Sequence, residues 1–526
     1  MSDLAGLWAG AEPTHPFPDM AALMQDQILE NILLGLSVAI SPSGLFYCLI
    51  GVVLGTITGI IPGIGALAAV SLLFPITFHL APTEALIMLA GIYYGTTYGG
   101  STASILLNLP GTPSSAVACL DGYPMAQKGR GGVALFMTTI ASFVGGSIGI
   151  LVLIFLAPMI ISVAFMFAPA DYFSLILLGL IMTATISGGS VVKALIMSVF
   201  GILLGVVGLD VYYGSPRYTF GILHLYEGIS LVALAIGLFG IAEVIASIGK
   251  MVPVEMSRDK LRMRNMLPSR EEGRGSIAPI LRGAGIGTIL GALPGTGGTI
   301  ASYISYAVER RFSRTPDHFG KGAMEGLVGP ESSNNAADQT AFIPTLTLGI
   351  PGTATMAIML GVLMIHGINP GPRLVVEQPA LFWGLIMSFW IGNLLLLIIN
   401  IPMIGIWVRI LAVPYKILYP SILAFVCVGI YSINNSVFDI LVVVAFGVVG
   451  YGTKLLGLPL PPLLLGFVLG PMLEEHFRRA MLLSQGSFEV FVTRPISGAA
   501  VLIMAVALLY AMVRFVLSNS EKNRTI

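Results

Sequence analysis

Charged residues are scarce in this sequence. Only 10% of its 526 residues are Asp, Glu, Lys or Arg, and 56% are hydrophobic, whereas about a quarter of the residues of soluble domains are charged. The 26 basic residues balance the 26 acidic ones, so the net charge gives no reason to expect a nucleic-acid partner. This composition excludes an ordinary soluble protein and predicts an all-α polytopic membrane protein.

Basic residues, cysteine and histidine are also unevenly placed or few. The first 127 residues contain no Lys or Arg, so we expect no cleavable signal peptide, which begins with a basic region. Cys48, Cys119 and Cys427 form no CxxC pair and are expected to pack as small apolar residues. The 6 histidines are scattered and no His-Glu-x-x-His motif occurs. We therefore expect no metal centre, no cofactor and no enzyme activity.

Glycine, by contrast, is abundant and regularly spaced. A glycine at every fourth position lies on one helix face, where two helices approach closely in lipid, and a Pro-Gly pair then interrupts the helix. Eight of the 15 positions in 51–65 match their counterparts in 283–297. The two stripes are Gly51, Gly55, Gly59 and Gly63, and Gly283, Gly287, Gly291 and Gly295, and they end in Pro62-Gly63-Ile64-Gly65 and Pro294-Gly295-Thr296-Gly297. The sequence therefore predicts a duplicated, interrupted membrane helix.

A second breaker follows in each half, after a polar run. The breakers are Leu109-Pro110-Gly111-Thr112 and Ile350-Pro351-Gly352-Thr353, and the polar runs before them are 98–104 and 331–338. Because the order of features is the same, we expect two membrane repeats. The predicted organisation is an N-terminal segment (1–43), a first repeat (44–250), a cytoplasmic connector (251–277), a second repeat (278–480) and a C-terminal helix and tail (481–526).

Apolar segments of about 20 residues predict membrane-spanning helices. They lie near 86–107, 133–157, 172–188, 194–209, 228–248, 381–408, 418–433, 436–452 and 497–517. Segments 283–293 and 298–308 are shorter, and at about 1.5 Å per residue each crosses only about half of a ~30 Å hydrocarbon core. They predict a re-entrant helical hairpin with its tip inside the membrane.

Basic residues suggest how the two repeats are oriented. The loop at 77–84 has none, whereas its counterpart at 309–321 has Arg310, Arg311, Arg314 and Lys321. Downstream the bias reverses, because the first-half loop carries Lys128 and Arg130 while the second-half loop carries Arg373 beside Glu377. Under the positive-inside rule, corresponding loops lie on opposite sides, which predicts inverted repeats.

Interrupted helices inside a membrane are tolerated where protein, ligand or ion satisfies the freed backbone groups. Amides at the half-helix N-termini offer hydrogen-bond donors and a positive dipole end to a carboxylate. The predicted substrate-binding residues are Pro62, Gly63, Gly65, Pro110, Gly111, Thr112, Pro294, Gly295, Thr296, Gly297, Pro351, Gly352 and Thr353. As alternatives, Pro62 and Pro110 are packing kinks in ordinary helices, and a glycine stripe is only a helix contact face.

Oxygen-bearing side chains in the polar runs are candidate ligands for a coupling cation such as sodium. The predicted cation-binding residues are Ser101, Thr102, Ser332, Ser333, Asn334, Asn335 and Asp338. For Glu331 and Asp338, the alternative is a loop-end carboxylate that faces water.

Several of these motifs together resemble the large membrane subunit of the tripartite tricarboxylate transporters. The resemblance covers about residues 25–515 and rests on the run from Gly55 to Gly65, the stretch from Tyr94 to Ser101, the breaker from Leu109 to Pro113, and Gly329-Pro330-Glu331-Ser332-Ser333-Asn334-Asn335-Ala336. It implies a multi-pass permease of the bacterial inner membrane, driven by a sodium or proton gradient. It also implies a small four-helix membrane subunit and a periplasmic solute-binding protein as partners. Family substrates are mostly di- and tricarboxylates such as citrate.

The predicted mechanism is secondary transport, in which a carrier section with both hairpins moves against a scaffold as an elevator. An anion channel is the alternative, since broken helices can also form a filter. Uptake against a gradient separates the two.

Overall fold

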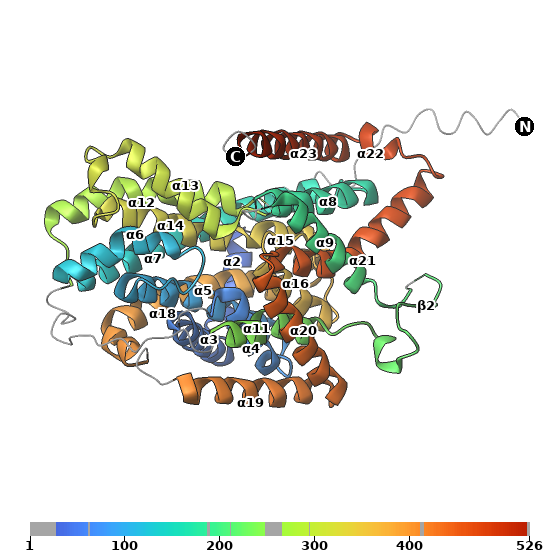
Figure 1. The fold of residues 1–526 in the computed structure, drawn as a ribbon, viewed down its shortest axis with the longest axis horizontal. Helices are drawn as coiled ribbons and strands as arrows, with labels where there is room; N and C mark the ends of the chain where they lie inside the picture. Colours follow the sequence, from blue (N-terminus) through green and yellow to red (C-terminus); the bar gives the residue numbers. More distant parts are fainter. Residues whose placement is uncertain are drawn as a thin grey trace, which may run out of the picture.

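The computed structural model describes residues 28–61, 64–186, 190–210, 212–247, 266–293, 295–410 and 415–522, which are almost entirely helical (Figure 1). The first half contains α2 (Ile28–Ala39), α3 (Pro42–Ile60), α4 (Ala66–Thr77), α5 (Pro82–Leu107), α6 (Ala116–Met125), η1 (Ala126–Arg130), α7 (Gly131–Ala164), α8 (Pro169–Ile186), α9 (Val191–Gly205), β1 (Gly208–Leu209), β2 (Pro216–Arg217), η2 (Leu223–Leu225), α10 (Leu231–Ala235), η3 (Ile236–Ile241) and α11 (Ala242–Ser247). The second half contains α12 (Arg270–Gly291), α13 (Gly297–Phe312), η6 (Pro316–His318), α14 (Met324–Thr340), α15 (Phe342–Leu348), α16 (Ala354–Ile365), α17 (Arg373–Glu377), α18 (Pro379–Ile410), α19 (Tyr415–Asn434), α20 (Val437–Leu455), α21 (Leu460–Leu483), α22 (Val490–Thr493) and α23 (Pro495–Lys522).

Apolar helices account for the predicted membrane spans. By length and composition, four described helical stretches are suited to cross a membrane: Pro42–Ile60, Ala116–Ala164, Pro379–Met403 and Val437–Leu455. Shorter apolar helices lie at several of the other predicted segments, for example α8 at 172–188 and α9 at 194–209. The protein is therefore an all-α, multi-pass membrane protein.

The first glycine stripe is the contact face of α3 against α5. A Cβ on Gly55 would lie 2.7 Å from the Cα and 2.8 Å from the carbonyl carbon of Ile92, and Gly51 and Gly59 meet the backbone of Met88 and Thr96 in the same way. Only glycine lets the two backbones come this close. The α5 helix returns the contact through its own glycines, which lie against the backbone of α3.

The second glycine stripe packs α12 against α14 by the same geometry. Gly283, Gly287 and Gly291 face the backbone carbonyls of Gly329, Ser333 and Ala337. These three partners are spaced by four residues, as Met88, Ile92 and Thr96 are on α5. Each stripe is thus a helix contact face, as the alternative interpretation had it, and each precedes an interruption.

Helices end near each Pro-Gly breaker. Between α5 and α6 the chain leaves the helix at Asn108, with φ of +58°, and between α15 and α16 it does so at Gly349, with φ of +70°. Because Pro110 and Pro351 lie between helices, neither kinks a continuous helix. The helices α3 and α4, and α12 and α13, are likewise separate elements on either side of the first breakers.

Two helices differ from the sequence prediction. The helix α12 begins at Arg270, inside the predicted connector, because Ser269 and Glu272 form a reciprocal capping box that starts the helix early. The polar run at 331–338 is helical and fully buried within α14. The interpretation of Glu331 and Asp338 as loop-end carboxylates that face water is therefore wrong, since both side chains lie inside the helix bundle, 3% and 5% exposed.

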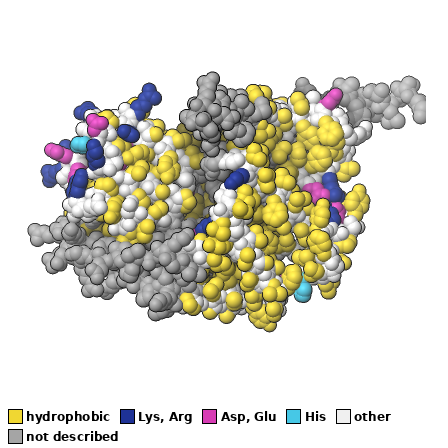
Figure 2. Space-filling view, viewed as in Figure 1, with side chains coloured by type: hydrophobic (Ala, Val, Ile, Leu, Met, Phe, Trp, Pro, Cys, Tyr) yellow, Lys and Arg dark blue, Asp and Glu magenta, His cyan; other side chains and the backbone are white. Residues whose placement is uncertain are grey.

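Basic side chains gather at one end of the molecule, which is formed by α6, α7, α12 and α13 (Figures 1 and 2). There Asp121 joins the two halves, because its Oδ1 accepts hydrogen bonds from the backbone N–H groups of Gly322 and Ala323 at 2.8 and 2.7 Å. Lys128 donates to the carbonyl of Lys321 at 2.6 Å. Much of the rest of the face in Figure 2 is hydrophobic, as expected for a surface in contact with lipid.

The short hairpin of β1 and β2 projects from the opposite end (Figure 1). Its charged base is Asp210, which accepts hydrogen bonds from the backbone N–H groups of Tyr213 and Tyr212 at 2.9 and 2.8 Å and from Arg478 at 2.9 Å. These donors, Tyr213 first, hold the pKa of Asp210 below its ordinary value.

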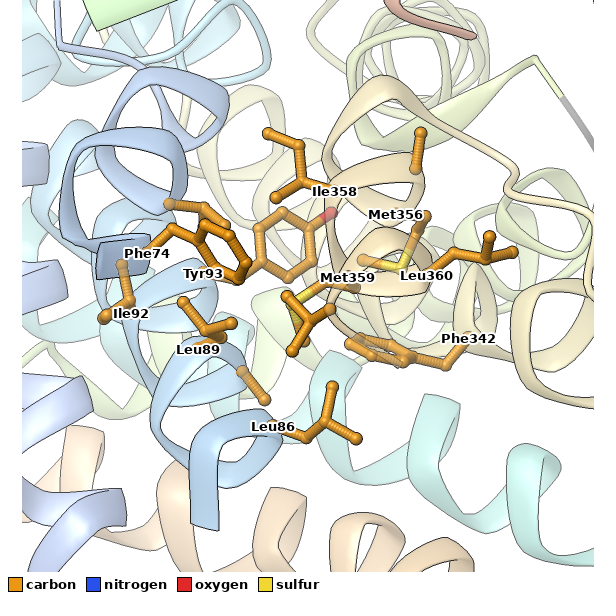
Figure 3. Close-up of a cluster of buried hydrophobic side chains, with 14 of the residues drawn as sticks. Phe74, Leu86, Leu89, Ile92, Tyr93, Phe342, Met356, Ile358, Met359 and Leu360 are labelled. Atoms are coloured by element: carbon orange, nitrogen blue, oxygen red, sulfur yellow. The ribbon is translucent and has the colours of Figure 1, made fainter. Parts of the chain in front are cut away.

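A buried apolar cluster joins α4, α5, α15 and α16 (Figure 3). The labelled members are Phe74 from α4, Leu86, Leu89, Ile92 and Tyr93 from α5, Phe342 from α15, and Met356, Ile358, Met359 and Leu360 from α16. The rings of Tyr93 and Phe342 lie 6.4 Å apart between centroids. This cluster fixes α5 of the first half beside α16 of the second.

Candidate functional site

One cavity of about 550 Å³ lies where the breakers of the two halves meet. It is lined by residues that follow or include each described breaker: Gly65, Pro110, Gly111 and Thr112 from the first half, and Gly295, Thr296, Gly297, Gly352 and Thr353 from the second. A cavity of this volume lies within the range of small-molecule sites.

The cavity is surrounded by helix N-termini. The helices α4, α6, α13 and α16 begin at Ala66, Ala116, Gly297 and Ala354, and residues at or just before each of these starts line the cavity. No side chain caps α4, α6 or α13 at its N-cap residue, whereas Thr353 Oγ1 accepts from the N–H of Met356 in α16. At the start of α6, the N–H groups of Ser115 and Ala116 donate to the carbonyls of Thr112 and Pro113. The first-turn amides of α4 and α13, and the dipoles of all four helices, favour an anion at such a place.

Two polar side chains of α14 complete the wall. Asp338 Oδ1 accepts a hydrogen bond from the hydroxyl of Tyr93 at 2.6 Å, and its Oδ2 accepts one from Thr97 at 3.0 Å. Asn334, one turn earlier, lines the same cavity. Neither polar atom of its side chain has a hydrogen-bond partner among the described residues, although the residue is only 1% exposed.

A second buried carboxylate lies behind the cavity wall. Glu331 Oε1 accepts hydrogen bonds from Ser101 of α5 at 2.8 Å and Ser142 of α7 at 3.0 Å. The amide of Asn335 donates to Ser142 at 2.8 Å. This network ties α14 to two helices of the first half and accounts for the burial of its polar residues.

The predicted site residues divide into three sets. Those that line the cavity are Gly65, Pro110, Gly111, Thr112, Gly295, Thr296, Gly297, Gly352, Thr353, Asn334 and Asp338. Pro62, Gly63 and Pro294 lie outside the described residues. Pro351, Ser101, Thr102, Ser332, Ser333 and Asn335 are buried but do not line the cavity. The binding roles of the residues in all three sets stay predictions.

Some of the last set have structural partners instead. Ser332 Oγ donates to the carbonyl of Ile280 at 2.8 Å, and Thr102 Oγ1 donates to the carbonyl of Tyr98 at 3.3 Å. Ser101 and Asn335 belong to the Glu331 network. The contacts of Ser332, Ser101 and Asn335 join helices, the bond of Thr102 lies within α5, and none of these four residues lines the cavity.

Of the α5 face that meets α14, only Ser101 was among the predicted site residues, whereas Tyr93 and Thr97 were not. Tyr93, Thr97 and Ser101 recur at every fourth position, so they lie on one face of α5, which is the face that meets Asp338 and Glu331. This spacing is visible in the sequence and is the signal that would have found them. Thr183 and Glu243 also line the cavity and carry no such signal.

The described residues give no support for a metal centre or a hydrolase. Within them, no group of three or more His, Cys, Asp and Glu side chains is placed to hold a metal ion. Residues 145–149, Gly-Gly-Ser-Ile-Gly, match the Gly-x-Ser-x-Gly motif that holds the nucleophilic serine in many hydrolases. Ser147, however, lies within α7 and accepts a hydrogen bond from Asn393 at 3.2 Å. The nucleophile elbow of hydrolases instead places its serine on a sharp turn between a strand and a helix.

Comparison with known proteins agrees with this architecture. The model of the tripartite tricarboxylate transporter TctA family matches residues 45–465. An Agrobacterium vitis protein described as an uncharacterized 52.8 kDa protein in the TAR-I ttuC' 3' region is 47% identical over 495 residues, which cover 94% of this chain and 98% of the relative. A second A. vitis protein, described as lying in the TAR-II ttuC' 3' region, is 50% identical over 236 residues, or 45% of this chain and 98% of the relative. No solved structure matches. The chain therefore belongs to the tripartite tricarboxylate transporter TctA family.

Proposed function

We propose that this protein is the large permease subunit of a binding-protein-dependent secondary transporter, which imports a di- or tricarboxylate or a related organic anion. One observation carries the proposal: the N-termini of α4, α6, α13 and α16 surround a single cavity. Backbone amides at these ends provide donors for carboxylate oxygens without a fixed positive charge. The volume of about 550 Å³ has room for a citrate-sized anion.

An ion gradient, of sodium or protons, supplies the energy in this proposal. The cavity wall carries the carboxylates of Asp338 and Glu243, and its described part contains no Lys, Arg or His. Glu243 forms an ion pair with Lys454, so Asp338 carries the negative charge that no described basic side chain offsets. An organic anion that enters this site adds to the negative charge already there. A coupled cation offsets that charge, which links movement of the anion to movement of the cation.

Inverted repeats are the second part of the proposal. Two observations support them: α3 packs on α5 as α12 packs on α14, and Asp121 of α6 and Lys128 of η1 bond to residues 321–323 at the basic end. Residues 121–130, which follow the second breaker of the first half, thus lie next to residues 321–323, which follow the first breaker of the second half. Inverted repeats place these two regions on the same side of the membrane. The basic end then faces the cytoplasm.

Re-entrant hairpins and an elevator-type movement are the third part of the proposal. The hairpin tips at the ends of α12 and α3 lie at the cavity, where the carrier section carries its ligand. The partners in this proposal are a small four-helix membrane subunit and a periplasmic solute-binding protein, and the location is the bacterial inner membrane. The TctA family implies such partners in general.

The test is uptake into proteoliposomes that contain this chain and its small membrane subunit. A panel of radiolabelled di- and tricarboxylates is presented with the purified binding protein, under an inward sodium gradient, an inward proton gradient, or neither. We expect accumulation of at least one acid above its external concentration, only with a gradient and only with the binding protein present.

Two results would count against a carrier. Flux that stops at equal internal and external concentrations favours the anion channel. No gradient-dependent flux of any acid in the panel, from a complex whose three components are shown to be folded, contradicts the proposed function as a whole.

A further inference from the structure

The side chain of Asn334 is buried in a polar position that nothing in the described protein satisfies. Its Oδ1 and Nδ2 both lack a hydrogen-bond partner among the described residues, and the residue is 1% exposed. Leaving a buried amide unpaired is unfavourable, because the lost contacts with water are not replaced. Because Asn334 lines the cavity, a ligand that enters from the cavity is in a position to recover this energy.

Gly298, in the first turn of α13, marks where such a ligand fits. A Cβ at this position would overlap Asn334 Oδ1 and lie 2.9 Å from Asp338 Oδ1. The two oxygens come from successive turns of α14, because residues four apart lie on one helix face. Both oxygens lie against the backbone of Gly298, which has no side chain to push them away, and both residues line the cavity.

The chemistry of these two oxygens suits a monovalent metal cation better than a proton. An amide oxygen is not a proton carrier near neutral pH, whereas amide and carboxylate oxygens together are the ligands of hard cations. Asp338 contributes one negative charge, and its orientation is set by hydrogen bonds from Tyr93 and Thr97. One charge among the ligands balances one positive charge.

We propose that Asn334 and Asp338 bind a sodium ion at the cavity wall, where both lie next to Gly298, and that this ion must be bound for the organic anion to bind in the cavity. The requirement of the ion for anion binding rests on the proposed function, but the ion site itself does not. The site is narrower than the sequence predicted, because Ser332 and Asn335 have other partners.

Thermal unfolding of the purified full-length chain tests the ion site without any transport assay. Its Tm is measured in NaCl, KCl and choline chloride at equal concentration and pH. We expect Tm to rise with NaCl and to saturate, because an ion that binds only the folded state stabilises it. Asn334→Ala and Gly298→Ala are expected to lose this sodium-specific rise, since the first removes a ligand and the second displaces the two ligand oxygens.

Matched controls separate ligand loss from general damage. Asn400 of α18 also has a buried Oδ1 without a partner in the described structure, but it does not line the cavity. Gly285 of α12 has no atom within 4 Å of the position of an added Cβ. Asn400→Ala and Gly285→Ala should therefore keep the sodium response of the wild type.

Equal Tm values for the wild type in the three salts would overturn the inference, as would a full sodium response in Asn334→Ala. If Gly298→Ala does not fold, the wild type and Asn334→Ala still decide the question. In the uptake assay, Asn334→Ala should raise the half-saturating sodium concentration at least about tenfold, because loss even of an outer-shell contact weakens metal binding about 10- to 100-fold. A chain that binds sodium but accumulates no carboxylate would refute the proposed function and leave the ion site standing.

Discussion

Replacing Gly287 by alanine tests the glycine contact between α12 and α14. The new Cβ would overlap the backbone carbonyl of Ser333 and lie 2.7 Å from its carbon and 2.8 Å from its Cα. A backbone cannot turn aside as a flexible side chain can, so the two helices must separate. Overpacking of this kind costs about 1–3 kcal/mol, against a gain of about 0.4–1 kcal/mol from the smaller entropy of the unfolded chain.

Gly285→Ala, two residues earlier on the same helix, is the matched control. Its Cβ meets nothing within 4 Å, so only the entropic gain of about 0.4–1 kcal/mol remains. We expect Gly287→Ala to unfold below the wild type and Gly285→Ala to unfold at or above it. The assay is thermal unfolding in detergent, followed by tryptophan fluorescence, with both variants at the same protein and detergent concentrations.

The first half offers an independent repeat of this test. Gly55→Ala would place its Cβ 2.7 Å from the Cα of Ile92, whereas Gly452 of α20 has no atom within 4 Å. Gly452→Ala, the control, should again be more stable than Gly55→Ala. If Gly287→Ala and Gly55→Ala are as stable as their controls, the stripes are not close-packed faces and the helix pairing described above is incorrect.

Three further predictions concern polar contacts. Asp210→Asn should remove a loss of stability that the wild type shows in acid. Folding lowers the pKa of Asp210, so this carboxylate stabilises the protein above its unfolded pKa, and that contribution is lost as the pH falls through its folded pKa. Unfolding scans from pH 6 to pH 3 check this. Tyr93→Phe should lower uptake more than it lowers Tm, since it removes one hydrogen bond to Asp338 at the cavity wall. Arg282→Ala should destabilise the chain by about 1–3 kcal/mol, because Glu309 is 1% exposed and loses its ion-pair partner, while the double change Arg282→Met with Glu309→Leu should recover most of the loss.

Local periodicity predicted much of the fold. Regular glycines indicated the contact faces of α3 and α12, and Pro-Gly pairs indicated where helices end, because both act on the backbone within a few residues. The start of α12 at Arg270 had a readable signal as well, the Ser-x-x-Glu capping box at Ser269. A search for apolar segments misses this helix start, because the first turns of α12 are charged.

Long-range pairing was not visible in the sequence. The run from Glu331 to Asp338 has the composition of a loop, since Ser, Asn and Asp favour turns over helix interiors. It forms a buried helix because partners elsewhere in the chain accept or donate its hydrogen bonds, among them Tyr93 and Ser142. The two residues of the Tyr93–Asp338 pair are 245 positions apart, so no local pattern predicts that they meet.

Thiol protection at the cavity tests the central claim, that the organic anion binds where the four helix N-termini meet. Ser114 lines the cavity and is partly exposed, so Ser114→Cys is introduced after Cys48, Cys119 and Cys427 are replaced by alanine. The rate of modification by a hydrophilic thiol reagent is measured in the reconstituted complex, with and without the transported carboxylate in sodium buffer. We expect the carboxylate to slow modification at concentrations that saturate uptake. An unchanged rate under those conditions would contradict binding in this cavity.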